Sequence, residues 1–202
     1  SLHDASKYVR SAIFNAKISD ITKPKKENEH LIEPLLYALS ALMVSGNFVS
    51  PLDEKKYMTK DEKDRFFRTF VFTNDSLNND EIKGPETWAV FLGFMEALEG
   101  KQLLEGKQLV QLVVDPTRAV KEVILEHLTP NDEVSIKELK ALVGQHIPIL
   151  DGGIYFQQAR DVIASRTKLI DHQRKLTPAF SQALNRLITE GILEREISLS
   201  DS

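Results

Sequence analysis

The segment 176–197 constrains the fold more than any other part of the chain, because it combines a marked helix start, an apolar stripe and a marked helix end. Thr177 is a residue type that caps helices by accepting a backbone N–H bond, and Pro178 suits the first helical position because it lacks an N–H. Apolar residues then recur at helical spacing. Gly191 stands where a left-handed residue ends many helices. We therefore predict a helix over 177–190.

The six residues after this glycine alternate loosely between apolar and polar types, as a half-buried strand does, which predicts a strand over 192–197. A last helix that turns at a glycine into a strand is typical of a winged-helix domain. Earlier patterns predict the helices that would precede it, at 116–128, 136–145 and 154–165, the last of which is an insertion into the minimal arrangement. The predicted fold class is mainly α with a small β component, in which a helical N-terminal region (1–84) precedes a winged-helix-like domain (85–202).

The first region contains three stretches with helical apolar spacing, at 2–18, 31–45 and 60–72. Residues 73–84 are rich in Asn, Asp and Gly, which favours a boundary there. Pro85 then opens a predicted helix whose apolar face runs from Trp88 to Leu98. The pentapeptide EGKQL occurs at 99–103 and again at 105–109, a repeat too short for a repeat architecture. It predicts a hairpin or loop that leads into a strand over 109–114.

Local signals mark two further helix starts. Asp115 followed by Pro116 predicts an N-cap and a first helical residue, an interpretation we prefer to a catalytic carboxylate. Ser135 and Glu138 have the spacing of a capping box. The Asp-Gly-Gly at 151–153 is the sharpest turn signal in the chain.

Four segments in order resemble the bacterial DpdG family: WAVFLGF at 88–94, DPTRA at 115–119, IPILDGGIY at 147–155 and LTPAFSQALNRL at 176–187. That family belongs to genomic islands that install 7-deazaguanine bases in DNA and restrict DNA lacking them. The resemblance covers about 85–202 and implies a non-catalytic accessory subunit of an anti-phage or anti-plasmid complex. Its implied partners are protein subunits, an ATPase or a nuclease, and similar winged-helix subunits act as bridges in SMC-type machines.

The composition and motifs favour a binding protein over an enzyme. The chain has no cysteine, its five histidines are scattered in sequence, and it contains no HExxH, phosphate-loop or GxSxG motif. We therefore predict no cofactor, no metal site and no catalytic residues. No apolar run approaches the roughly 18 residues of a membrane span, so we expect no membrane partner and a cytoplasmic location.

Two modes of binding remain open from the sequence. The formal net charge of −4 argues against nucleic-acid binding by charge alone. Residues 160–175, however, hold five basic and two acidic residues, and polar side chains line the predicted outer face of the last helix. The candidates for contact with double-stranded DNA are Arg166, Lys168, Arg174, Lys175, Ser181, Gln182, Asn185 and Arg186. The same surface could instead dock a protein, and a dimeric transcriptional regulator is the third possibility.

Overall fold

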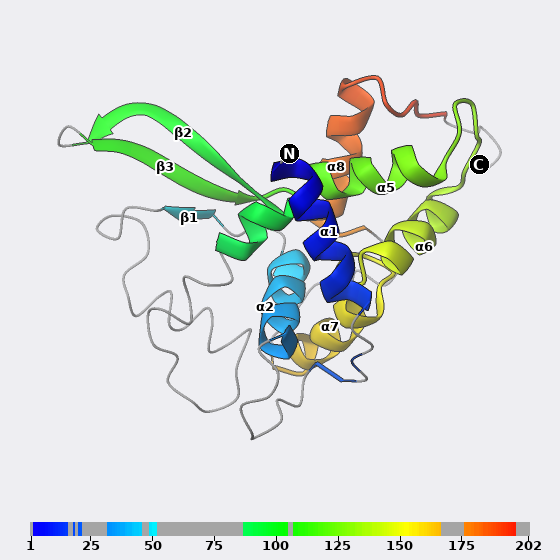
Figure 1. Ribbon diagram of the computed structural model, residues 1–202, viewed down its shortest axis with the longest axis horizontal. Coiled ribbons are helices and arrows are strands. Elements are labelled where there is room, and N and C mark those ends of the chain that lie inside the picture. The colour runs from blue at the N-terminus through cyan, green and yellow to red at the C-terminus, as the bar shows by residue number, and fades with distance from the viewer. Residues whose placement is uncertain are drawn as a thin grey trace.

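The computed structural model describes residues 2–15, 18, 20–21, 32–45, 49–51, 87–104, 107–166 and 176–196. Figure 1 shows a body of helices from which a long β-hairpin projects. The elements in chain order are α1 (Leu2–Asn15), α2 (Ile32–Ser45), β1 (Val49–Pro51), a short helix at 87–92, β2 (Met95–Leu104), β3 (Lys107–Val114), α5 (Thr117–His127), α6 (Ile136–His146), α7 (Ile154–Arg166) and α8 (Pro178–Thr189). The predicted fold class, mainly α with a small β component, is confirmed.

The sheet has three antiparallel strands in the order β1-β3-β2. The predicted hairpin is confirmed: β2 and β3 pair from Met95↔Val114 at the body to Leu104↔Lys107 at the far end, with a register irregularity between Glu99 and Leu103. The predicted strand 109–114 lies within β3. The other edge of β3 pairs with β1 near the body.

The helix predicted to run through Leu98 ends at Leu92, so that prediction is wrong beyond this residue. Gly93 adopts a φ of +86°, the left-handed region that glycine enters without a steric penalty. Its N–H donates to Val90 O at 3.2 Å, and the N–H of Phe94 donates to Ala89 O at 2.8 Å. The chain therefore leaves the helix at a glycine C-cap, and β2 begins at Met95.

The predicted helix starts are confirmed at α6 and α8. Ser135 and Glu138 form both bonds of a capping box, and Thr177 Oγ1 accepts the N–H of Phe180 at 3.3 Å. At α5 the prediction is wrong by one residue, because Pro116 holds the cap position and the helix begins at Thr117. The Asp115 carboxylate still accepts the N–H of Thr117 at 2.9 Å, so the sequence signal marked the correct turn.

One hydrophobic core runs through the described helices, from Ile13 in α1 to Leu187 in α8. Its largest fully buried side chains include Leu36, Phe94 and Phe180. Helix α2, which precedes residue 84, packs against α7, which follows it. The two-region division at residue 84 stays a prediction, and the helix predicted over 60–72 lies outside the described residues.

The strand predicted over 192–197 is wrong for its described part, because residues 192–196 form no strand. Gly191 has the expected positive φ of +70°. The chain then folds back on the end of α8, where the N–H groups of Ile192 and Leu193 both donate to Leu187 O. The apolar side chains of these two residues pack against the core in place of a sheet. The helices expected of a winged helix are present at α5, α6 and α8, but the hairpin precedes them in the chain.

Candidate functional site

The start of α8 is fixed by a buried carboxylate. Asp151, in the turn before α7, accepts the N–H of Thr177 at 2.9 Å and its hydroxyl at 2.5 Å. Both residues are almost fully buried, and Thr177 in turn caps α8. A buried, hydrogen-bonded pair of this kind holds the helix in one orientation, because separating it would leave polar groups unsatisfied away from water. The outer face of α8 is therefore presented in a fixed direction.

Four of the eight candidate residues lie on this face. Gln182, Asn185 and Arg186 are exposed, and Ser181 is half-buried. Arg166 is the last residue of α7, and its side chain lies outside the described part of the structure, as do Lys168, Arg174 and Lys175. The structure thus brings together the four α8 candidates, and contact of any of the eight with DNA stays a prediction.

Arg186 has two acidic partners. Its Nη1 atom lies 2.7 Å from Glu96 Oε2, at the start of β2, and it also forms an ion pair with Asp115, just before α5. The Asp115 side chain is only 4% exposed, and it accepts hydrogen bonds from the N–H and the hydroxyl of Thr117. One guanidinium group therefore ties α8 to the base of the hairpin and to the start of α5.

These residues line a surface hollow of about 340 Å³ between α5, α8 and the base of the hairpin. Two more cations on its wall also have partners. Lys121 of α5 pairs with Glu190 at the end of α8 at 2.7 Å, and Arg118 Nη2 donates to the carbonyls of Val90 and Phe91 at 3.0 and 2.6 Å. The three positive groups of the hollow are thus all engaged within the chain.

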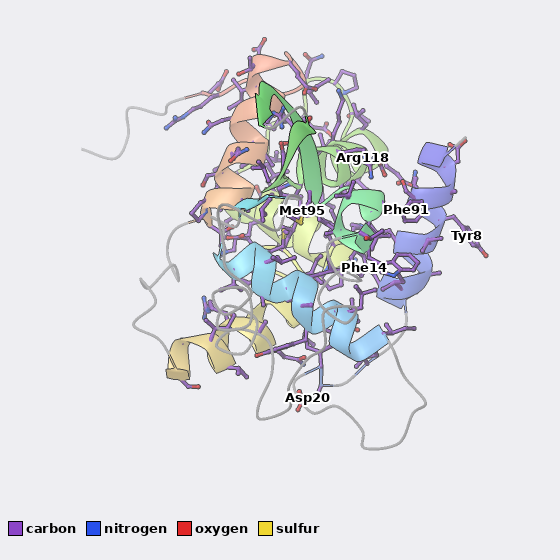
Figure 2. All side chains as sticks on the ribbon, turned by 90° about the vertical axis from the view of Figure 1, so that its left-hand side faces the viewer. Tyr8, Phe14, Asp20, Phe91, Met95 and Arg118 are labelled. Atoms are coloured by element: carbon purple, nitrogen blue, oxygen red, sulfur yellow. The ribbon has the colours of Figure 1, made fainter. Side chains whose placement is uncertain are left out.

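A third arginine binds at the base of the hairpin. Arg10, buried in α1, donates to Leu92 O at 2.6 Å and pairs with Glu122 of α5. Together with Arg118, it binds the last three carbonyls of the helix at 87–92, where the regular bonds of the helix end. Figure 2 places Arg118, Phe91 and Met95 around this junction. Burial lowers the pKa of Arg10, and the neighbouring Glu122 opposes that shift.

The sequence did not predict this junction, because its partners are far apart in the chain. Asp115 carried a local signal as a helix-start residue, but nothing in the sequence indicated that it would pair with Arg186. Gly93 did carry a signal, as a glycine inside an apolar helical pattern. A Cβ at this position would lie 2.6 Å from Nε of Arg118, so any larger residue would require that side chain to move.

The described residues hold no group of three or more His, Asp or Glu side chains that could bind a metal ion. None of the described helices has the length and apolar character needed to cross a membrane.

Comparison with known proteins gave one family. A family model described as DpdG-like matches residues 2–201, which extends the resemblance carried by the four motifs to nearly the whole chain. Searches of curated proteins and of solved structures found no match.

Proposed function

The chain belongs to the DpdG-like family, and from this premise we propose that it is a non-catalytic accessory subunit that docks an ATPase or a nuclease within a bacterial anti-phage or anti-plasmid complex. Membership of the family connects the chain with a DNA-modification and defence system. The proposed role within that system is to bind a protein partner through the surface formed by α8 and its neighbours. This binding takes place in the cytoplasm, and the partner could belong to an SMC-type machine.

The observation that carries the proposal is the pairing of Arg186. Apart from this guanidinium, which is held by Glu96 and Asp115, the exposed side chains of α8 are all neutral: Pro178, Gln182, Asn185 and Thr189. Affinity for nucleic acid depends on cations that neutralise phosphates and release counterions. Arg118 and Lys121 beside this face are also engaged. A balanced polar surface of this kind favours a protein partner over a phosphate backbone.

The projecting hairpin supports a bridging role. Figure 1 shows it extending well beyond the helical body. The helix at 87–92 that leads into it is held by Arg10 of α1 and Arg118 of α5, and its first strand is held by Arg186 of α8. An arm that is fixed at its base can contact a second subunit without a large entropic cost of ordering.

Co-purification with the products of neighbouring genes tests the proposal. The informative variant is Gln182→Arg with Asn185→Arg, which places two positive charges on the outer face of α8 without removing an internal contact described above. We expect it to lose the partner that the wild-type chain retains. Gln145→Arg, on the exposed surface of α6, is the matched control and should retain it. A wild-type chain that elutes alone after co-expression with all its neighbours would contradict the proposal.

The alternative is a DNA-binding transcriptional regulator, which the basic stretch at 160–175 favours. It requires the chain itself to retard a duplex, and it requires that retardation to be abolished when Arg166, Lys168, Arg174 and Lys175 are changed to Glu. Under our proposal the isolated chain gives no sequence-specific retardation at physiological salt. If the wild-type chain retards one operator sequence and the quadruple variant does not, the chain is a transcriptional regulator and not an adaptor.

A further inference from the structure

Two histidines that are separated in the sequence are stacked in the fold. His127 is the last residue of α5 and His146 the last of α6. Their ring centroids lie 3.9 Å apart with an interplanar angle of 21°. The lone pairs of an imidazole lie in the plane of its ring, so nearly parallel stacked rings do not direct them at a common metal ion. The contact is therefore one between ring faces, and it joins the C-terminal ends of two helices.

The charges around the stack act in opposite directions. A helix C-terminus favours positive charge, and Glu126, the residue before His127, adds a carboxylate to the same place. That carboxylate is already paired with Lys7 of α1, whose Nζ lies 2.9 Å from Glu126 Oε2. Protonation of His146 is disfavoured by its burial and by the second imidazole at stacking distance.

From this arrangement we infer that the His127–His146 stack is a proton-sensitive contact that holds α5 against α6 when the rings are neutral and loosens when both are protonated. Protonation of both rings places two like charges at stacking distance, where their repulsion is strongest. The inference does not depend on the proposed function.

The direction of the pH effect follows from the surroundings of His146. Burial, and after it the neighbouring His127, lowers its pKa below the ordinary value of 6.5, and Glu126 opposes the shift. The unfolded chain therefore binds this proton more readily than the folded one. Stability is fully present above pH 6.5 and is lost as the pH falls from there through the lowered pKa.

Titration of the histidine ring signals by NMR tests the inference, in the wild type and in three single variants. His127→Gln should raise the pKa of His146 toward its ordinary value. Glu126→Gln should lower it further, because the opposing carboxylate is removed, and Lys7→Gln should raise it, because the carboxylate is released from its lysine. A pKa of His146 that is unchanged in His127→Gln would overturn the inference.

A second measurement remains informative if a single variant is destabilised. Melting temperatures of the wild type, His127→Gln, His146→Gln and the double variant give the coupling between the two rings. We expect this coupling to be favourable at pH 8 and to weaken or reverse at pH 5.5. An equal coupling at both pH values would identify a packing contact without proton sensitivity and would overturn the inference.

Discussion

The helical segment (helices α5, α6, α7 and α8) and the hairpin junction (the helix at 87–92 with β2 and β3) are held together in different ways. In the helical segment, side chains such as Phe180 and Leu187 are fully buried, and the helices begin at local caps such as Ser135. At the junction, three arginines from α1, α5 and α8 bind carbonyls and carboxylates of distant segments. Both regions bury apolar side chains, Leu92 and Phe94 among them at the junction, but the junction depends in addition on the geometry of a few charged contacts.

This difference shows where the chain is sensitive to change. Hydrophobic burial is non-directional and roughly proportional to area, so the helical segment should tolerate apolar replacements of similar volume. A buried ion pair stabilises only when both partners are present and well placed. The junction should therefore lose stability when a single partner is removed and recover when both are replaced by apolar groups.

The largest effect is expected in the helical segment, from Phe180→Ala. Phe180 is fully buried in α8, and truncation of a buried phenylalanine removes its transfer energy and leaves a cavity. We expect the free energy of unfolding to fall by about 4 kcal/mol, measured by urea denaturation followed by circular dichroism. Phe180→Leu, which keeps most of the volume, should lose clearly less. Equal losses in the two variants would show that cavity formation does not explain the effect.

At the junction we expect a loss of about 3 kcal/mol from Arg10→Ala, because it leaves Glu122 without its buried cationic partner. Glu122 is 11% exposed, so water provides little compensation. The double variant Arg10→Met with Glu122→Leu should recover most of the lost stability in the same denaturation experiment. A double variant as unstable as the single one would contradict an origin in the unpaired charge.

Gly93→Ala should cost about 2 kcal/mol, because Gly93 combines a positive φ with close contact to Arg118. Gly191→Ala is the matched control: its φ is also positive, at +70°, but no atom lies within 4 Å of the added Cβ. The control should lower the free energy of unfolding by about 1 kcal/mol, the cost of the positive φ alone. If the two variants melt at the same temperature, the contact with Arg118 contributes nothing.

The smallest effect concerns the cap of α6. Ser135→Ala removes both the acceptor of the Glu138 N–H and the hydroxyl that donates to the Glu138 carboxylate, for an expected loss of about 1 kcal/mol. Ser165→Ala, on the exposed surface of α7, removes a hydroxyl that has no capping role and should change stability by less than about 0.5 kcal/mol. A loss at Ser165 as large as that at Ser135 would argue against a capping contribution.

The sequence predicted those features whose physical cause is local. Ser135 with Glu138, Thr177 with Pro178, and Gly191 each act within one helical turn, so their roles are visible in a few consecutive residues. The end of the helix at Leu92 was not predicted, because the apolar spacing continues through Gly93 into β2. The strand expected after Gly191 is absent from the described residues because the chain folds back on α8. The side chains of Ile192 and Leu193 pack against the core there. The pairing of Arg186 with Asp115 and the stacking of His127 on His146 depend on the assembled fold.

Hydrogen exchange measured by mass spectrometry would show whether the outer face of α8 binds a protein partner in solution. The chain is compared free, with its co-purified partner and with duplex DNA. We expect the partner to slow exchange in α8 (Pro178–Thr189) and duplex DNA to leave it unchanged. Slowed exchange in α8 with duplex DNA, and none with the partner, would contradict this expectation.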